Sequence, residues 1–370
     1  MLELAPTRLF TGETMREGAS VVIDGERVIE IREKPSPSAT KLDGLLAPGF
    51  IDAQVNGGGG VLFNDAPTVE TLKTMAAAHR QFGVTAFMAT LISDDRAKTA
   101  KAINAVAAGI AAGTPGLLGI HLEGPWLSDA RRGVHPSKAL RPFDNEDLKL
   151  LAQQRPFPAL ITVAPEQIDA AGIRALRVAG VTISLGHTAA TAEDVEAALA
   201  AGATGFTHLF NAMPPIEGRK PGAAGAALAN RNAWAGLILD GIHVHPITAR
   251  MALAAKTAKK LFLVSDAMAT VGSKDPSMSL FGEQIAISDG ALRTVSGTLA
   301  GAHLDLSGAV RNAVSMLGAS MQDALRMASL TPAEFVGTND RGKIAPDCRA
   351  DLVLLGAELD VRKVWIGGKS

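Results

Sequence analysis

The chain has 370 residues, of which 47% are hydrophobic and 20% are charged, with a formal net charge of −1 and a single cysteine. This apolar content is enough for a large α/β domain with an appendage. The balanced charge, without a basic stripe or tail, argues against nucleic acid or an anionic membrane as a partner. One cysteine excludes an intrachain disulfide. With no signal-peptide pattern and no membrane-spanning run, we expect a cytoplasmic protein.

The two ends of the chain both have β-like patterns. Residues 20–34 predict a β-hairpin, because an Asp-Gly pair typical of a tight turn lies between two apolar stretches. Neither end could bury a core by itself. We therefore expect residues 1–47 and 342–370 to pair into one small β-sandwich domain, and residues 48–341 to form the main domain between them.

Eight nearly continuous apolar runs follow in the main domain, as expected for parallel strands buried on both faces. Helical patterns lie between several runs. One of them, residues 191–202, begins with Thr191 and Asp194 in the spacing of a capping box. Eight strand–helix units predict a (β/α)₈ barrel. A doubly wound open sheet is the main alternative, although it more often has fewer strands. The runs are residues 47–55, 84–92, 116–123, 159–166, 181–187, 205–210, 234–244 and 261–267.

Two further patterns come after the eighth run. Residues 283–297 predict a second β-hairpin, with Asp289-Gly290 at its turn. Residues 306–336 predict apolar helices, which we expect to close the barrel.

Polar residues gather where the predicted strands end. Five of the eight histidines end such runs: His121, His187, His208, His243 and His245. Because the carboxyl ends of barrel strands converge on one mouth, we expect these side chains to share the active-site face. Of the remaining histidines, His79 is expected on the exposed side of a helix, and His135 and His303 in loops.

Three of these strand-end residues suit a metal ion. Glu123, in the segment GIHLEGPW, would be costly to bury unless something paired with it. With His187 and His208 it would supply one carboxylate and two imidazoles, the ligand pattern of a catalytic site with an open position. A metal ion there would lower the pKa of water and polarise a carbonyl group. Asp266, at the end of the last run, is the candidate general acid/base.

Less specific interpretations stay open for single residues. A lone histidine at a strand end more often has a structural role, although coincidence across five strands is much less common. The loop 128–137 with His135 is a lid or simply a solvated loop. The glycine-rich residues 56–60 lack the lysine of a phosphate-binding loop. Arg219 suits an anionic substrate, but a surface arginine is the usual alternative.

Together these motifs resemble the amidohydrolase superfamily and, within it, the N-acetylglucosamine-6-phosphate deacetylases. The resemblance runs in family order through APGFIDAQVNG, HLEGPW, RRGVHP, LGHT, THLFNAMP, GIHVHP, VSDAMA and TLAGA. It implies hydrolysis of N-acetyl-D-glucosamine 6-phosphate to glucosamine 6-phosphate and acetate. It also implies that Glu123, His187 and His208 hold the metal, that Asp266 is the catalytic acid/base, and that the protein is a homodimer.

The resemblance further implies a set of substrate-binding positions. Arg219 is expected to act across the dimer interface, and His135 to lie on a lid. The full set is Val134, His135, Asn211, Ala212, Arg219, His243, Leu299, Ala300, Gly301 and Ala302.

One departure from the superfamily bears on the number of metal ions. Most members have His-x-His at the end of the first strand, whereas this chain has Gln54 and Asn56 there. Amides are poorer ligands than imidazoles for zinc or iron. We therefore expect one divalent ion per subunit, Zn²⁺ or Fe²⁺, with Gln54, Asn56 and His121 beside the ligands rather than among them.

Two other functions remain as alternatives. The same chemistry could act on another substrate, such as N-acetylgalactosamine 6-phosphate or a cyclic amide. A non-catalytic barrel is a more distant alternative, because it would not need all of the candidate ligands and the candidate acid/base.

Overall fold

The computed structural model describes residues 1–370, and eight parallel strands form its main sheet. Each strand pairs with the next along the chain, and a parallel bridge between Val55 and Ala267 joins the two edges. The prediction of a barrel is therefore confirmed over the open sheet. The strands are β6 (Phe50–Val55), β9 (Val84–Ile92), β10 (Leu117–Glu123), β11 (Ala159–Val163), β12 (Thr182–Leu185), β13 (Gly205–Phe206), β14 (Trp234–Ile238) and β15 (Leu261–Val264).

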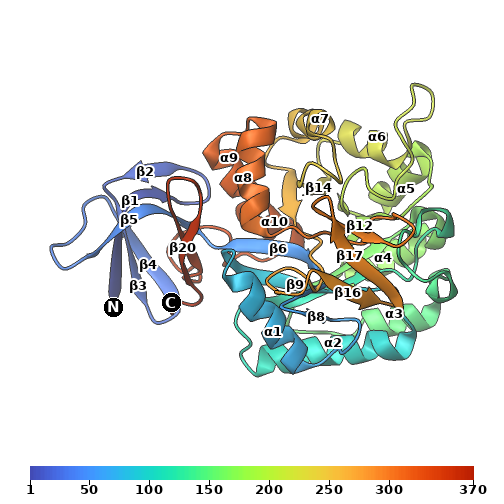
Figure 1. Ribbon diagram of the computed structural model, residues 1–370, viewed down its shortest axis with the longest axis horizontal. Helices are drawn as coiled ribbons and strands as arrows, with labels where there is room; N and C mark the ends of the chain where they lie inside the picture. The colour runs from blue at the N-terminus through green and yellow to red at the C-terminus, as the bar shows by residue number, and fades with distance from the viewer.

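Helices surround this barrel (Figure 1). The predicted capping box starts α5, where Thr191 and Asp194 bond each other's backbone N–H groups. Three helices were not predicted; one of them, α6, is built from small apolar residues and has no polar face to reveal its period. The helices are α1 (Val69–Arg80), α2 (Arg96–Ala111), α3 (Asn145–Leu151), α4 (Ala170–Val178), α5 (Ala192–Ala201), α6 (Gly222–Ala229), α7 (Pro246–Lys256), α8 (Leu306–Leu317), α9 (Met321–Ala328) and α10 (Leu330–Val336).

Both termini lie in a second, seven-stranded sheet beside the barrel (Figure 1). Alternate side chains of this sheet pack on opposite faces: Val353 and Leu355 join the barrel core, whereas Leu352 and Leu354 join a separate core. The exact division at residues 47/48 and 341/342 stays a prediction. The strands are β1 (Leu2–Phe10), β2 (Met15–Glu17), β3 (Ser20–Asp24), β4 (Arg27–Arg32), β5 (Thr40–Pro48), β19 (Leu352–Leu355) and β20 (Val361–Trp365).

A small antiparallel sheet contains the second predicted hairpin. β17 (Glu283–Ser288) and β18 (Ala291–Thr294) are joined by Asp289 and Gly290, both with positive φ as a type I′ turn requires. A third strand, β16 (Ser277–Leu280), completes this sheet. Its apolar side chains pack against Leu62 of the short β7–β8 hairpin (Gly57–Gly58 and Val61–Leu62) and against Met268. The sheet thereby covers the mouth of the barrel next to β15.

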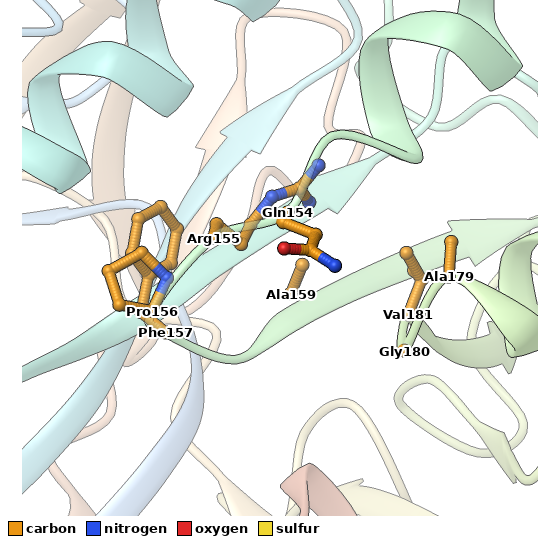
Figure 2. Close-up of a pocket in the computed structure, with 8 residues that line it drawn as sticks. All are labelled: Gln154, Arg155, Pro156, Phe157, Ala159, Ala179, Gly180 and Val181. Atoms are coloured by element: carbon orange, nitrogen blue, oxygen red, sulfur yellow. The ribbon is translucent and has the colours of Figure 1, made fainter.

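The opposite end of the barrel carries a cavity of about 480 Å³ where β11 and β12 begin (Figure 2). Its only charged side chain, Arg155, donates hydrogen bonds to the backbone carbonyls of Leu150 and Leu151. No carboxylate, imidazole or thiol lines it. This cavity therefore lacks the groups that acid–base or metal chemistry needs. No helix of the protein is both long and apolar enough to cross a lipid bilayer.

A buried charge cluster holds the loop after β10 in place. The carboxylate of Asp147 accepts hydrogen bonds from Trp126, at the start of the loop, and from Arg141, near its end. Arg96 of α2 donates a third bond. Burial opposes ionisation, but the bonds from Arg141, Trp126 and Arg96 lower the pKa of Asp147 to about 2.

Asp147→Ala should therefore destabilise the fold by roughly 2–4 kcal/mol, because it leaves Trp126 and Arg141 without their acceptor. Urea denaturation measures this loss. The difference between the wild type and Asp147→Asn should shrink as the pH falls from about 4 to about 2, because the unfolded carboxyl is protonated first and the native one only near its pKa of about 2. Asp43→Asn is the control, because Asp43 is almost fully exposed in its pair with Arg362. An equal loss of stability in Asp147→Ala and Asp43→Asn would contradict this account.

Candidate metal centre

Three of the predicted site residues leave their strands in an unusual backbone conformation. His187, His208 and Asp266 have φ angles of 48°, 29° and 51°, in the left-handed region that side chains other than glycine seldom adopt. The chain turns sharply at each of them, immediately after β12, β13 and β15. Such strain persists only where the surrounding structure fixes it, and it concentrates at functional sites.

The side chains of Glu123, His187 and His208 meet at one point. Nε2 of His208 lies 3.0 Å from Oε1 of Glu123 and 3.0 Å from Nε2 of His187, and the remaining distance, between His187 Nε2 and Glu123 Oε1, is 3.3 Å. In a tetrahedral site with metal–ligand bonds of about 2.0–2.1 Å, neighbouring ligand atoms are roughly 3.3 Å apart. The three atoms therefore have the spacing of three corners of such a site.

The electrostatics of this cluster also suit a cation. Glu123 is 3% exposed. Burial alone would raise its pKa, but the imidazoles of His187 and His208 beside it hold the pKa of Glu123 well below its usual range. Nδ1 of His187 donates to the backbone carbonyl of Arg131 at 2.8 Å, so Nε2 is the nitrogen that this ring presents to Glu123 and to a metal ion. Nδ1 of His208 is buried without a partner.

Gln54 and Asn56 connect the metal cluster to Asp266. Nε2 of Gln54 donates to Oε1 of Glu123 at 3.0 Å and to Oδ1 of Asp266 at 3.1 Å. Nδ2 of Asn56 donates to the same Oδ1 at 2.7 Å. The amide of Gln54 thus bridges the two buried carboxylates, and the amide of Asn56 adds a second donor to Asp266. Burial first, and then the charge of Glu123, raise the pKa of Asp266 to about 6.

His135 reaches the same centre from the loop 128–137. Its ring lies 4.5 Å from that of His187, and one of its nitrogens lies within 4.8 Å of Glu123 and His187 ligand atoms. Nδ1 of His135 lies 2.7 Å from Oγ of Ser93 and 3.3 Å from the backbone nitrogen of the same residue. Ser93 thus holds Nδ1 and leaves Nε2 for the cluster, where it can bind a metal ion or, when it carries the proton, donate a hydrogen bond. Ser93 gave no sign of this role in the sequence.

A cavity of about 390 Å³ opens above the cluster. Most predicted substrate-binding residues line it, as do the candidate metal ligands and Asp266. Asp240, to which the sequence assigned no role, supports the predicted substrate-binding residue His243: Oδ2 of Asp240 lies 2.6 Å from Nδ1 of His243. The predicted residues in the lining are Asn56, Glu123, Val134, His135, His187, His208, Asn211, Ala212, His243, Asp266, Leu299 and Gly301.

Three predicted substrate-binding residues do not line the cavity. Ala300 is buried in the core under the small sheet, and the N–H of Ala302 donates to the backbone carbonyl of Asp266 at 2.9 Å. Arg219 lies on an exposed turn between Glu217 and Lys220, whose backbones bond each other. Figure 1 shows this loop, before α6, extending away from the barrel.

His121 occupies the layer of the barrel interior below the cluster. Its Nδ1 lies 3.1 Å from Thr90 Oγ1 and its Nε2 lies 2.7 Å from Thr162 Oγ1. Thr162 in turn bonds Thr207, which donates to Ser184. This chain of hydroxyl groups links β9, β10, β11, β12 and the residues after β13. Both ring nitrogens are therefore occupied, in line with a place beside the ligands rather than among them.

The expectation for His79 was wrong. Its side chain is fully buried, with Nε2 2.8 Å from the carbonyl oxygen of Gly57 in the glycine-rich loop. A Cβ atom on Gly58 would lie 2.7 Å from the same nitrogen. The close approach of the imidazole ring therefore requires glycine at position 58. This contact is tertiary, and helical periodicity alone does not reveal it.

Comparison with known proteins agrees with this geometry. The profile of the amidohydrolase family matches residues 45–370. The chain belongs to the amidohydrolase family. Members of this family are metal-dependent hydrolases. Glu123, His135 and His187 offer buried ligand atoms close enough to share a metal ion, and His208 meets Glu123 and His187 at the same point.

The similar proteins are sugar-phosphate deacetylases. N-acetylgalactosamine-6-phosphate deacetylase from Shewanella sp. (strain ANA-3) is 46% identical over 326 residues, 88% of this chain and 83% of the relative. N-acetylglucosamine-6-phosphate deacetylase from Vibrio furnissii is 33% identical over 372 residues, 98% of this chain and 93% of the relative. A mutant of the Mycobacterium smegmatis N-acetyl-D-glucosamine-6-phosphate deacetylase, solved in complex with that sugar phosphate, superimposes with a TM-score of 0.91 at 32% identity, covering 100% of this chain and 98% of the other.

His121→Leu should destabilise the metal-free protein by roughly 2–3 kcal/mol, because it leaves buried hydroxyl groups without their partner. Denaturant unfolding after treatment with a chelator measures this loss. His245→Asn is the control, since His245 is exposed and asparagine can still accept the Ile247 N–H that the His245 side chain accepts at the start of α7. A stability equal to that of the wild type would show that the ring does not support the strand ends.

Proposed function

We propose that this chain hydrolyses the acetamido group of N-acetyl-D-glucosamine 6-phosphate, giving D-glucosamine 6-phosphate and acetate. The observation that carries the proposal is the convergence of Glu123, His187 and His208 beside Asp266 at the base of one cavity. The named relatives and the substrate complex of the Mycobacterium smegmatis enzyme support the choice of substrate.

Glu123, His187 and His208 would hold a divalent ion, Zn²⁺ or Fe²⁺, whose role is to polarise the acetamide carbonyl and to lower the pKa of water. Gln54 and Asn56 support a count of one ion, since each directs an N–H bond at a carboxylate oxygen. The amide oxygen that remains is a poorer ligand for zinc or iron than the imidazole that most superfamily members have at these positions.

Asp266 is the proposed acid/base. Its Oδ1 accepts both amide hydrogen bonds, so Oδ2 is the oxygen left to exchange a proton. Oδ2 takes a proton from the attacking water and returns it to the departing amine. A pKa raised to about 6 suits both steps near neutral pH.

The other residues bind the two ends of the substrate. The Nε2–H of His135 is proposed to stabilise the negative charge that develops on the acetamide oxygen. His243, Asn211 and Ala212 are proposed to hold the phosphate, with Asn211 and Ala212 offering their backbone N–H groups.

Asp266→Asn should abolish turnover and leave the bound metal in place, because the amide cannot accept the proton of water. Steady-state rates and elemental analysis of the same preparation test both parts, with about one divalent ion per chain expected in each protein. Chelation should remove activity, and added metal should restore it. In the wild type, kcat/KM should fall as the pH drops below about 6, where Asp266 becomes protonated. Full activity in the Asn variant would overturn the mechanism.

A second candidate substrate is N-acetyl-D-galactosamine 6-phosphate, the C4 epimer. The specific observation in its favour is the 46% identity to the Shewanella enzyme named for that substrate. The metal cluster and Asp266 act on the acetamide group, which both epimers share, so they cannot discriminate between them. Values of kcat/KM for the two epimers, measured side by side, decide the question. A clear preference for the galacto epimer would replace the first substrate with the second.

We also propose that the protein is a homodimer in which Arg219 completes the neighbouring site. In one chain the exposed turn keeps Arg219 out of the cavity lining, although a phosphate dianion favours an arginine.

Co-expression of Asp266→Asn with Arg219→Ala tests this arrangement. Each variant alone should be impaired, and the mixed dimer should regain activity, because one of its two sites has both Asp266 and an intact Arg219 from the other chain. Differently tagged chains allow the mixed dimer to be purified. Rates of the mixed dimer no higher than those of the separate variants would show that Arg219 acts in the site of its own chain or in no site.

A further inference from the structure

Asp240 and His243 form a close pair beside the cavity, after the end of β14. His243 Nδ1 lies 2.6 Å from Asp240 Oδ2, and the two side chains are only 5% and 11% exposed. A carboxylate oxygen can only accept, so Nδ1 carries the proton. The other ring nitrogen, Nε2, makes no hydrogen bond with any protein atom, and the ring lines the cavity.

The two carboxylate oxygens of Asp240 have separate tasks. Oδ1 accepts the backbone N–H groups of Ile242 and His243, each at 2.8 Å, and so builds the turn that contains the histidine. Gly241, with a φ of 77°, lets the chain make this turn. Oδ2 is left for the imidazole alone. The orientation of the ring is therefore fixed both through the backbone and through Nδ1.

The carboxylate of Asp240 is ionised beside the ring. Burial opposes its ionisation, but the hydrogen bond from His243 lowers the pKa of Asp240 below its usual value. Once a phosphate enters the cavity, the ring lies between two anions and can donate to both only when both of its nitrogens carry a proton. A protonated Nε2 facing the cavity would donate a charge-assisted hydrogen bond to an anion.

We propose that Asp240 is a positioning residue that holds His243 with Nδ1 protonated and Nε2 directed at the phosphate of the substrate. This inference rests on the proposed function. Asp240 makes no contact with the substrate; it acts by presenting His243 as a charged donor, and so contributes to the preference for phosphorylated over unphosphorylated acetamido sugars.

Asp240→Asn separates this role from the role in the turn. The amide oxygen of asparagine can still accept the two backbone N–H groups, but its NH₂ group faces Nδ1 and requires the ring to accept there. The ring then stays neutral, with its only proton on Nε2. Asp275→Asn is the matched control, because Asp275 also accepts a backbone N–H, that of Ser277 at 2.9 Å, and is exposed without a histidine partner.

The experiment measures kcat and KM of the wild type and both variants on N-acetylglucosamine 6-phosphate and on N-acetylglucosamine. For Asp240→Asn, KM for the phosphorylated sugar should rise about tenfold or more, since a charge-assisted bond is lost. The unphosphorylated sugar should be affected far less, and Asp275→Asn should behave as the wild type. An unchanged KM, or an equal loss on both sugars, would overturn the role of Asp240. A wild type inactive on both sugars would instead overturn the proposed function, and this role with it.

NMR of protein labelled with ¹⁵N-histidine gives a readout that does not depend on turnover. The wild type and Asp275→Asn should show a low-field proton bound to Nδ1 of His243, assigned by its loss in His243→Asn and distinct from the Nδ1 proton of His187, and Asp240→Asn should lack it. A signal that persists in Asp240→Asn would show that Asp240 does not hold the ring.

Discussion

The architecture of this site depends on the cost of burying one carboxylate. Glu123 ends a strand in the interior of the barrel, where an unpaired charge would be unfavourable by several kcal/mol. The chain offsets this cost with two imidazoles and an amide, all directed at Oε1. His187 and His208 must leave their strands with positive φ to reach that atom. The strained backbone at the mouth of the barrel is thus a consequence of the requirement to surround Glu123.

The same requirement explains why Gln54 and Asn56 matter although neither suits a metal. Asp266 is a second buried carboxylate near Glu123, and the charge of Glu123 is one cause of its raised pKa. A second cation between them would neutralise both groups. Neutral amide donors stabilise both carboxylates less than a cation would, so Asp266 keeps a pKa near neutrality. The substitution of imidazoles by amides at the first strand therefore suits a proton-transfer role for Asp266 as well as a single metal ion.

Much of this could be predicted from the sequence, because strand-end residues of a parallel barrel share one face. The eight apolar runs, the two Asp-Gly turns and the placement of Glu123, His187, His208 and Asp266 at the mouth follow from pattern and topology alone. The prediction for His79 was wrong because its contact with Gly57 is tertiary and leaves no local signal. The predicted runs also extended past the real strand ends to His187 and His208. The positive φ of these two residues ends the extended backbone, and the residue types alone do not reveal such a change of conformation. The role of Ser93 and the pairing of Asp240 with His243 are visible only in the structure.

The division between strands and loops has a consequence for specificity. The groups proposed for the chemistry, namely the metal ligands and Asp266, lie at the ends of barrel strands, supported from below by the hydroxyl chain around His121. The groups proposed for the sugar and the phosphate lie on loops, from Val134 and His135 through Asn211 to Leu299 and Gly301. Loops tolerate change better than a packed barrel core. A family built in this way can alter its choice between sugar epimers by changing loop residues alone, while the Glu/His/His cluster and its acid/base stay as they are. Relatives named for different epimers can therefore both resemble this chain over most of its length.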